Sequence, residues 1–466
     1  MATRYIVCMD SRFTHHNSHL EDADSFEYLD PNLRRLRKQP LVYQAPLLES
    51  LPVEPGIFTI TGGRQVGKTT LLKQWMARLL STGLPPSTLI YLSGELIDDH
   101  HSLIRIINDI LSDSPDLRYL IIDEVTYIRN WDKAVKFLAD AGQLDDVILV
   151  LTGSDILILS EARMRFPGRR GVADEVDFHL YPLSFAETVH LKGILDDEQQ
   201  QSVQHAPSAE TVRILFTAFD EYLMHGGFLT AINDLSAHAR ILPATMRTYS
   251  DWIRGDVLKR GRHEHFLREI ITAIIRRYCS QITWNNLLAD LSIDHPKTVA
   301  DYVQLLAAMD AAYIQSAIKE DLLCAAPKKA KKLLFTDPFI YHALNDWVSP
   351  ERHRQDGYTL MMTTLADSVL TGQLVESCAV SHCRRFYATY YIKAKGEVDI
   401  ACVQGKRFQP IEVKWTSQLR PGELKQIRKY PNGRIWTKNS NSGEILGLPV
   451  TQLPVALYLV DRLFSI

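Results

Sequence analysis

Residues 62–69 read Gly62-Gly63-Arg64-Gln65-Val66-Gly67-Lys68-Thr69, which matches the pattern GxxxxGK[ST] without a gap. An apolar run at residues 57–60 precedes this segment, and apolar side chains recur at helical spacing from Leu71 to Leu80 after it. Strand, glycine-rich loop and helix form the context of a phosphate-binding loop, because backbone N–H groups at the helix start wrap the phosphates. A chance glycine-rich turn would not carry all three features.

The side chains of this loop have separate tasks in nucleotide binding. We expect Lys68 to reach the β and γ phosphates and the Thr69 hydroxyl to bind Mg²⁺. The remaining nucleotide-binding positions are Gly62, Gly63, Arg64, Gln65, Val66, Gly67 and Thr70. ATP and Mg²⁺ are therefore the expected cofactors.

Two acids end the apolar strand that we predict at residues 119–123. Asp123 stands where a carboxylate would hold Mg²⁺, and Glu124 where one would polarise the attacking water. Adjacent acids at a strand end also occur in capped turns. A spacing of about 55 residues from the loop, with another predicted strand at residues 88–92 between them, favours the metal and base roles.

Two further positions are candidates for completing the nucleotide site. The predicted strand at residues 147–152 leads into Thr152-Gly153-Ser154, which would place the Ser154 hydroxyl as a sensor of the γ phosphate, although such turns are common elsewhere. Gly168-Arg169-Arg170 precedes the predicted strand at residues 176–180, where Arg169 or Arg170 would act on a neighbouring subunit's nucleotide. A solvated arginine pair is the alternative.

These motifs together resemble a widespread bacterial and archaeal branch of AAA+ ATPases, and the similarity covers most of residues 40–466. The run Leu180-Tyr181-Pro182-Leu183-Ser184-Phe185 belongs to the same pattern. In that branch a domain of unknown function follows the core, and Glu221-Tyr222 with Gly226-Gly227-Phe228 looks like its opening motif. The resemblance implies ATP binding, ATP hydrolysis and a homo-oligomeric ring, with a hexamer as the favoured size.

Short apolar runs alternating with helical patterns over residues 56–180 predict an α/β core, a P-loop parallel five-stranded sheet covered by helices. The polar stretch at residues 194–210 is expected to be a loop or a surface insertion. We divide the chain into an N-terminal extension (1–50), the AAA+ core (51–190), a helical lid with the polar insertion (191–261), a winged helix-turn-helix (262–345) and a nuclease-like α/β domain (346–466).

Residues 282–306 resemble a winged helix-turn-helix, with a second helix at 296–306 and a two-stranded wing at 313–317 and 332–335. That helix would turn Lys297, Thr298, Tyr302 and Gln304 outward and also carries Asp301. Because the helix offers so few side chains that could contact bases, we favour a packing or DNA-backbone-binding role for it over base reading.

The last hundred residues change to an α-β-β-β-α-β pattern, in which the second helix ends at Tyr430. Glu376, Asp399, Glu412 and Lys414 resemble the PD-(D/E)XK nuclease-like family in spacing and strand context. By that resemblance Asp399 and Glu412 would hold a second divalent metal, Lys414 would position water and Glu376 would complete the site. Alternation along a strand places Glu412 and Lys414 on one face. The alternative is a degenerate fold that uses these charges as a buried ion-pair network.

Composition sets limits on partners and location. The 52 basic and 55 acidic side chains give a net charge of −3, so total charge does not predict nucleic-acid binding. Basic residues cluster locally at residues 254–262, 328–332 and 393–434, which favours DNA-backbone contact without sequence specificity over ordinary solvated faces. No apolar run approaches the ~20 residues of a membrane helix. The six cysteines form no CxxC pair, so we expect a cytoplasmic protein with no membrane contact.

Two functions stay open from the sequence, and an ATP-gated nuclease that couples the ATPase and nuclease-like sites is a third. In the first, a ring couples ATP hydrolysis to remodelling of DNA or movement along it, branched or forked DNA included, and cleavage by the nuclease-like site stays open. In the second, a nucleotide-switched regulatory ATPase uses a degenerate nuclease-like domain for interaction. DNA should raise ATP hydrolysis in the first case and leave it unchanged in the second.

Overall fold

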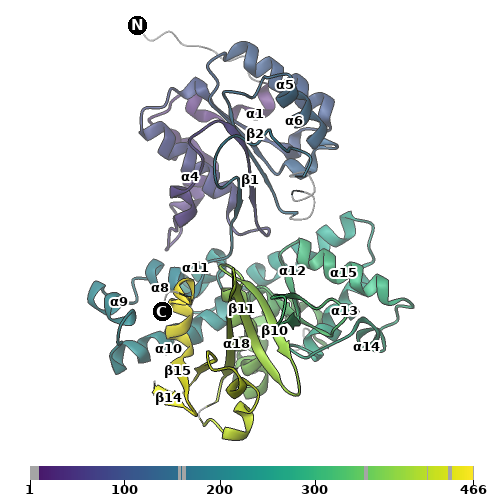
Figure 1. Ribbon diagram of the computed structural model, residues 1–466. Helices are drawn as coiled ribbons and strands as arrows, with labels where there is room; N and C mark the ends of the chain where they lie inside the picture. The colour runs from purple at the N-terminus through teal and green to yellow at the C-terminus, as the bar shows by residue number, and fades with distance from the viewer. Residues whose placement is uncertain are drawn as a thin grey trace. The chain divides into compact units, whose positions relative to one another are not determined.

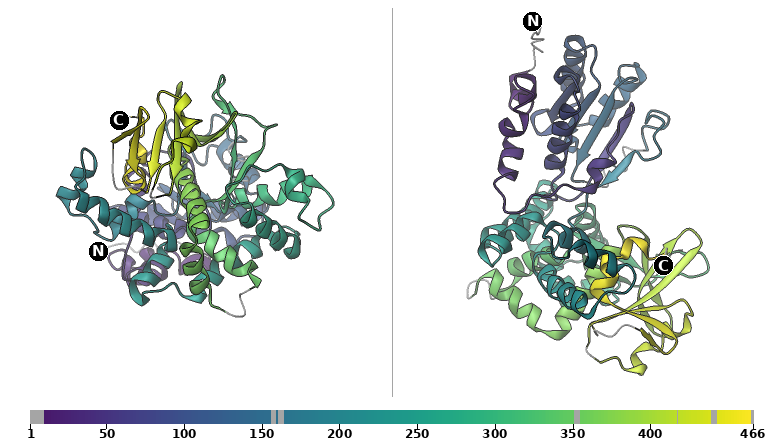
Figure 2. Two further views of the ribbon diagram at one scale, coloured as in Figure 1. Left: turned by 90° about the horizontal axis from the view of Figure 1, so that it is seen from below. Right: turned by 90° about the vertical axis from the view of Figure 1, so that its left-hand side faces the viewer.

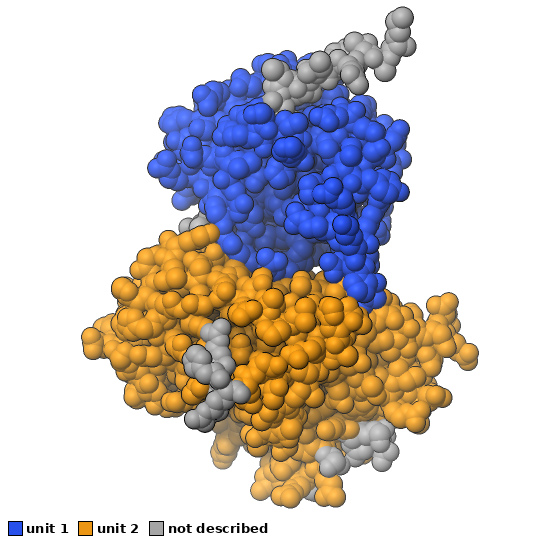
Figure 3. All heavy atoms as spheres, turned by 180° about the vertical axis from the view of Figure 1, so that it is seen from behind, with its two compact units in different colours: residues 1–180 blue, residues 181–466 orange. Residues whose placement is uncertain are grey.

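The computed structural model describes residues 10–155, 159, 164–350, 355–416, 418–438 and 443–464. The chain divides into two compact units, Met1–Leu180 and Tyr181–Ile466, which Figure 3 colours separately. Each unit has a sheet of its own. The finer division into five parts stays a prediction. Within the described ranges, every helix is too short or too polar to cross a lipid bilayer.

The first unit is built on a five-stranded parallel sheet with the order β2-β3-β4-β1-β5, which confirms the predicted α/β class. Its strands are β1 (Gly56–Thr61), β2 (Leu89–Ser93), β3 (Tyr119–Asp123), β4 (Ile148–Gly153) and β5 (Asp177–His179). Because all five run the same way, the carboxyl ends of β1, β3 and β4 meet at one edge, where ligands bind in open α/β sheets.

Helices cover both faces of this sheet (Figure 1). On one face, α4 (Lys68–Ser81) packs Leu72 and Met76 in the same core as Phe58. On the other face, α5 (His100–Asp113) and α6 (Trp131–Asp140) share a core with Leu120 and Leu149. Alternate residues of each strand face the two cores, as expected for strands that are buried on both sides.

The described residues of the predicted N-terminal extension are part of the first unit. They form α1 (Ser11–Thr14), η1 (Ser18–Leu20), α2 (Phe26–Leu29), α3 (Pro31–Leu36) and η2 (Pro46–Glu49). Phe13 joins the core on one face of the sheet, whereas Phe26 and Leu33 join the core on the other. The segment therefore passes around the edge strand β2, and Figure 2 shows it in purple beside the sheet.

The second unit begins with six helices: α8 (Phe185–Leu191), α9 (Asp197–Val203), α10 (Ala209–His225), α11 (Leu229–His238), α12 (Pro243–Lys259) and α13 (Glu264–Arg276). Helix α9 corrects the prediction of a loop at residues 194–210. Its start is stabilised by a capping box, in which Asp196 and Gln199 each bond the other's backbone N–H group.

The region predicted as a winged helix contains α14 (Trp284–Leu288), α15 (Pro296–Ala308) and an antiparallel pair, β6 (Ala312–Ser316) and β9 (Lys331–Phe335). A second pair, β7 (Ile318–Lys319) and β8 (Cys324–Ala325), lies between them. The expected outward orientation of Tyr302 is wrong, because its side chain is 1% exposed and its hydroxyl accepts from the backbone N of His263 at 2.7 Å. The winged-helix assignment itself stays a prediction.

Helices α16 (Pro338–Val348), α17 (Gly357–Ala366) and α18 (Ser368–Cys383) lead to a mixed sheet with the order β10-β11-β12-β13-β15-β14. Helix α18 packs against its first three strands (Figure 1). The strands are β10 (Ala388–Lys393), β11 (Glu397–Gln404), β12 (Arg407–Lys414), β13 (Arg434–Thr437), β14 (Gly443–Ile445) and β15 (Leu448–Gln452).

The predicted helix that ends at Tyr430 is wrong. In its place stand two 3₁₀ turns, η7 (Pro421–Leu424) and η8 (Ile427–Lys429). Pro421-Gly422 and Pro431 bracket a segment too short for a stable helix, because proline and glycine disfavour helix interiors. Strands β14 and β15, α19 (Leu453–Tyr458) and η9 (Val460–Arg462) were not predicted.

Candidate functional site

The phosphate-binding loop leaves β1 and enters α4 at Lys68. Gly67 has a φ of +101°, which favours glycine, and a Cβ atom on Gly62 would clash with the carbonyl oxygen of Leu180. Lys68 Nζ donates to the carbonyl oxygens of Gly62 and Gly63, both at 3.0 Å. The ammonium is therefore folded into the loop that phosphates would occupy.

Three hydroxyl groups hold the Asp123 carboxylate. Thr69 Oγ1 donates to Asp123 Oδ2 at 2.6 Å, and the Tyr91 hydroxyl donates to the same oxygen at 2.7 Å. Thr152 Oγ1 donates to Asp123 Oδ1. The two predicted magnesium ligands, Thr69 and Asp123, thus lie side by side, and both offer the oxygen atoms that Mg²⁺ prefers.

Glu124 follows Asp123 in a left-handed conformation, with a φ of +53°. Such a conformation is strained for a residue other than glycine and is held by its surroundings. The Glu124 carboxylate accepts from Ser154 Oγ at 2.8 and 2.9 Å, and its Oε1 lies 3.4 Å from Lys68 Nζ. Five predicted site residues therefore meet at the carboxyl ends of β1, β3 and β4: Lys68, Thr69, Asp123, Glu124 and Ser154.

Sequence reasoning missed two residues of this site, Tyr91 and Thr152. Thr152 immediately precedes Gly153-Ser154, so its place in the sequence indicated that it could belong to the site. Tyr91 lies on the edge strand β2, 32 residues before Asp123, and no spacing pattern connects the two.

The two candidate finger arginines lie in different environments. Arg170 donates from Nε to Ile57 O at 3.1 Å, and from Nη2 to Val176 O at 2.8 Å and Asp177 Oδ1 at 2.5 Å. Ile57 lies at the start of β1, so Arg170 braces the end of the strand remote from the phosphate-binding loop. Arg169 pairs with Asp140, and its side chain is 30% exposed.

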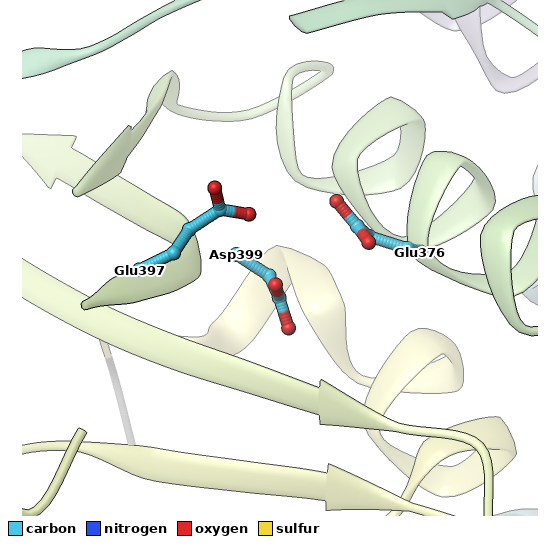
Figure 4. Close-up of side chains that lie close together, drawn as sticks. All are labelled: Glu376, Glu397 and Asp399. Atoms are coloured by element: carbon cyan, nitrogen blue, oxygen red, sulfur yellow. The ribbon is translucent and has the colours of Figure 1, made fainter. Parts of the chain in front are cut away.

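A second cluster of charges lies in the second unit. Glu376 on α18 and Glu397 and Asp399 on β11 bring one carboxylate oxygen each within 4.8 Å of the others. Figure 4 shows Glu376 pointing from its helix toward the two acids of the strand. Glu397 was not assigned a role from the sequence, although it lies two residues before Asp399 and therefore on the same strand face.

Lys332 of β9 occupies this cluster. Its Nζ lies 2.6 Å from Glu376 Oε1 and 3.8 Å from Asp399 Oδ1, and it also forms an ion pair with Glu397. The Lys332 side chain is fully buried, so its predicted membership of a DNA-facing basic cluster is wrong. Burial opposes the charge, but the three carboxylates hold the pKa of Lys332 well above its usual value.

Glu412 and Lys414 share one face of β12, with Glu412 Oε1 2.6 Å from Lys414 Nζ. Strands β11 and β12 pair Ile400 with Ile411, so one step further Asp399 lies opposite Glu412. Burial, with Asp399 as the second cause, raises the pKa of Glu412 to about 8, and burial raises the pKa of Glu376 to about 7. Glu412 is not among the acids grouped closely enough to share a metal in the described part of the chain.

Two family models match parts of the chain. Residues 54–189 match an AAA domain, and residues 216–351 match a domain of unknown function, DUF8612. The first match contains the phosphate-binding loop and the residues gathered around Asp123. The chain therefore carries an AAA domain with a P-loop nucleotide site.

Individual relatives share less with this chain. An uncharacterized protein of Haemophilus influenzae is 29% identical over 182 residues, a segment that covers 38% of this chain and 40% of that protein. A Walker-type ATPase of Pyrococcus abyssi is 15% identical, with a TM-score of 0.41 over 64% of this chain and 92% of that one. The Aeropyrum pernix Orc1 protein in complex with DNA is 12% identical, with a TM-score of 0.30 over 74% and 96%. These structural scores are too low to support an argument.

Proposed function

We propose that this chain is a Mg²⁺-dependent ATPase whose active site lies at the carboxyl ends of β1, β3 and β4. The proposal is carried by the joint placement of Lys68, Thr69, Asp123 and Glu124 within an AAA domain. Lys68 and the loop N–H groups would bind the phosphates, aided by the positive end of α4. Thr69 and Asp123 would hold Mg²⁺, which when bound neutralises phosphate charge.

Glu124 is the general base in this proposal. Lys68 and Ser154 hold its carboxylate from two sides. Phosphates bound in the loop would compete for the Lys68 ammonium, and Glu124 would then be free to accept a proton from water. Ser154 is the proposed sensor of the γ phosphate, because its hydroxyl can donate to a phosphate oxygen in place of the Glu124 carboxylate.

Arg169 is the proposed finger that acts on a neighbouring subunit's nucleotide in a homo-oligomeric ring, with a hexamer favoured. Arg170 is hydrogen-bonded to Ile57 of β1 and Asp177 of β5, whereas Arg169 is about a third exposed and has one acidic partner, Asp140. An exposed guanidinium can exchange its carboxylate partner for phosphate groups bound by another subunit, because guanidinium groups bind both kinds of anion.

DNA is the proposed partner of the second unit, contacted through its phosphate backbone without sequence specificity and with branched or forked forms included. Lys328 and Lys329, which precede β9, are exposed, and so are Lys393 and Lys395 at the β10–β11 turn. Lys329 Nζ donates to the Lys393 carbonyl oxygen at 3.2 Å. We call these four residues the lysine rim; none of them has a carboxylate partner among the described residues. Such a group favours salt-sensitive binding of phosphates.

The acidic cluster supports the second candidate function, in which the nuclease-like domain interacts rather than cleaves. The residues do not fit a divalent metal in this arrangement, because the Lys332 ammonium lies among Glu376, Glu397 and Asp399. Divalent-metal binding by Glu376, Glu397 and Asp399 would require the Lys332 ammonium to leave. We therefore assign no cleavage step to this arrangement of the cluster.

Steady-state ATP hydrolysis tests the proposal when it is measured without DNA and with single-stranded, duplex and four-way junction DNA. We expect hydrolysis that requires Mg²⁺ and rises severalfold with at least one DNA form. A rate that no DNA changes would favour the nucleotide-switched regulatory function. The absence of any ATP hydrolysis under all conditions would remove the ATPase assignment.

A further inference from the structure

The N-terminal segment reaches the proposed magnesium site through the interior of the first unit. The link to the site is Tyr91, whose hydroxyl donates to Asp123 Oδ2, the oxygen that also accepts from Thr69. Tyr91 is 2% exposed and Asp123 is 4% exposed, so water does not compete freely for this bond. A change in the position of Tyr91 would therefore act directly on the carboxylate.

Lys73 of α4 connects Tyr91 with the N-terminal segment. Its Nζ lies 3.6 Å from the centre of the Tyr91 ring and 3.4 Å from Asp30 Oδ2, and it donates to the carbonyl oxygen of His16 at 2.6 Å. The side chains of Lys73 and Asp30 are both fully buried. The other oxygen of Asp30 caps α3, accepting from the backbone N of Asn32 at 2.8 Å and of Leu33 at 3.1 Å.

Asn17 fixes the backbone of Tyr91. Its Nδ2 donates to Tyr91 O at 2.7 Å, and its Oδ1 accepts from Tyr91 N at 2.8 Å. Tyr91 lies on the edge strand of the sheet, where both backbone groups would otherwise lack a neighbouring strand. The Asn17 side chain takes the place of that strand, so the backbone of Tyr91 is held from outside the sheet while its hydroxyl is bonded to Asp123 of β3.

A buried ion pair is weak evidence for a stabilising role, because well-packed apolar side chains in its place are often as stable or more stable. The Asp30–Lys73 pair instead directs a positive charge at the aromatic ring that holds Asp123. Residues 16–30 lie outside the matched AAA domain, which begins at residue 54.

We propose that residues 16–30 form part of the nucleotide site, with Asp30, Lys73 and Tyr91 as positioning residues for the Asp123 carboxylate. This inference rests on the proposed magnesium role of Asp123. Partners that orient a metal ligand from outside the coordination sphere change metal affinity by about 10- to 100-fold when they are removed. Loss of the Tyr91 hydroxyl should therefore weaken magnesium-dependent binding and leave metal-free nucleotide binding intact.

The test uses the full chain and a fluorescent ATP analogue, with binding measured in EDTA and across a Mg²⁺ titration. For Tyr91→Phe we expect a 10- to 100-fold rise in the Mg²⁺ concentration that gives half of the magnesium-dependent gain in binding, with unchanged affinity in EDTA. Lys73→Met and Asp30→Asn should shift the titration in the same direction. Tyr119→Phe is the matched control, because Tyr119 is a buried tyrosine of the same core at the opposite end of β3 from Asp123.

Two results overturn the inference alone: a Tyr91→Phe titration that matches that of Tyr119→Phe, or an equal loss of affinity in EDTA and in Mg²⁺. Tyr91→Phe removes one oxygen atom, so it keeps the test decisive if the charge variants fail to fold. A wild-type chain that binds no nucleotide at any Mg²⁺ concentration overturns the proposed function, and this inference with it.

Discussion

Lys332 Nζ and Glu376 Oε1 lie 2.6 Å apart, although β9 and α18 belong to regions that the sequence divides between two predicted domains. This contact joins the predicted wing to the predicted nuclease-like acids. It places a positive charge beside Asp399, one of the two residues that the resemblance to nucleases assigns to a metal ion. Whether the acidic cluster accepts a metal is therefore decided by a residue outside the resembling motif.

Lys332→Met should destabilise the protein by about 3–5 kcal/mol in EDTA, because the variant leaves buried carboxylates without their partner. Mn²⁺ should restore part of the lost stability by occupying the vacated space. Urea unfolding with and without Mn²⁺, in the absence of nucleotide, measures both effects. Lys331→Met is the control, since Lys331 is the half-buried neighbour on β9 and its Nζ donates to the Pro327 carbonyl oxygen. Tight Mn²⁺ binding by the wild-type cluster, with Lys332 intact, would contradict this account.

Lys68→Ala should abolish ATP binding or turnover, because it removes the charge that contacts the β and γ phosphates. Glu124→Gln should keep nucleotide binding and lower turnover by about 10²- to 10⁴-fold, the usual contribution of a general base. Equilibrium binding and steady-state hydrolysis separate the two effects. Normal turnover in Glu124→Gln would show that another group activates the water.

Arg169→Ala and Arg170→Ala should differ in kind. Arg169→Ala should lower turnover of the assembled protein by about 10³- to 10⁵-fold, as loss of a finger in trans does elsewhere, with little change in melting temperature. Arg170→Ala should lower the free energy of unfolding by about 1–3 kcal/mol, because it removes a donor to the carbonyl oxygen of buried Ile57 on β1 and an ion pair with Asp177 on β5. Thermal melting and hydrolysis at protein concentrations above and below assembly measure both. Loss of turnover in Arg170→Ala with loss of stability in Arg169→Ala would instead assign the finger role to Arg170.

The lysine rim should control DNA affinity. Replacing Lys329, Lys393 and Lys395 by alanine should weaken duplex binding at all sequences and reduce the slope of log K against log salt by about one per lost phosphate contact. Binding isotherms at several salt concentrations give that slope. The control replaces three exposed lysines of the first unit, Lys38, Lys133 and Lys136. Equal losses in both triple variants would point to total charge rather than to the rim.

The contribution of Glu412 to the free energy of unfolding should fall as pH rises from about 5 to about 8, opposite in sign to that of the buried histidines whose pKa is lowered to about 3 or 4. In this interval the folded chain keeps a proton on Glu412, whose pKa is about 8, while an unfolded glutamate has released it. This contribution is therefore fully present below the unfolded pKa and is lost as pH rises through the folded pKa. Glu412→Gln should remove this contribution, and Glu376, whose pKa is raised to about 7, contributes in the same direction. Superimposable pH profiles of melting temperature for wild type and variant would disprove the assignment.

Local pattern determined much of the first unit. The glycine loop, the apolar strands and the Asp123-Glu124 pair specify a strand-loop-helix unit and its ligand edge, because backbone conformation and two-sided burial are encoded in adjacent residues. Alternation likewise placed Glu412 and Lys414 on one face, as their contact confirms. These features need information from only a few neighbouring positions.

Tertiary structure alone decided which distant side chains complete the sites. Tyr91 reaches Asp123 from an edge strand, Lys73 meets Asp30 from the N-terminal segment, and Lys332 enters the cluster of Glu376 from another hairpin. No periodicity or spacing connects these residues, since their contacts follow from strand order and helix packing. A buried charge needs an oppositely charged or hydrogen-bonding partner. Which residue becomes that partner depends on proximity in three dimensions and not on position along the chain.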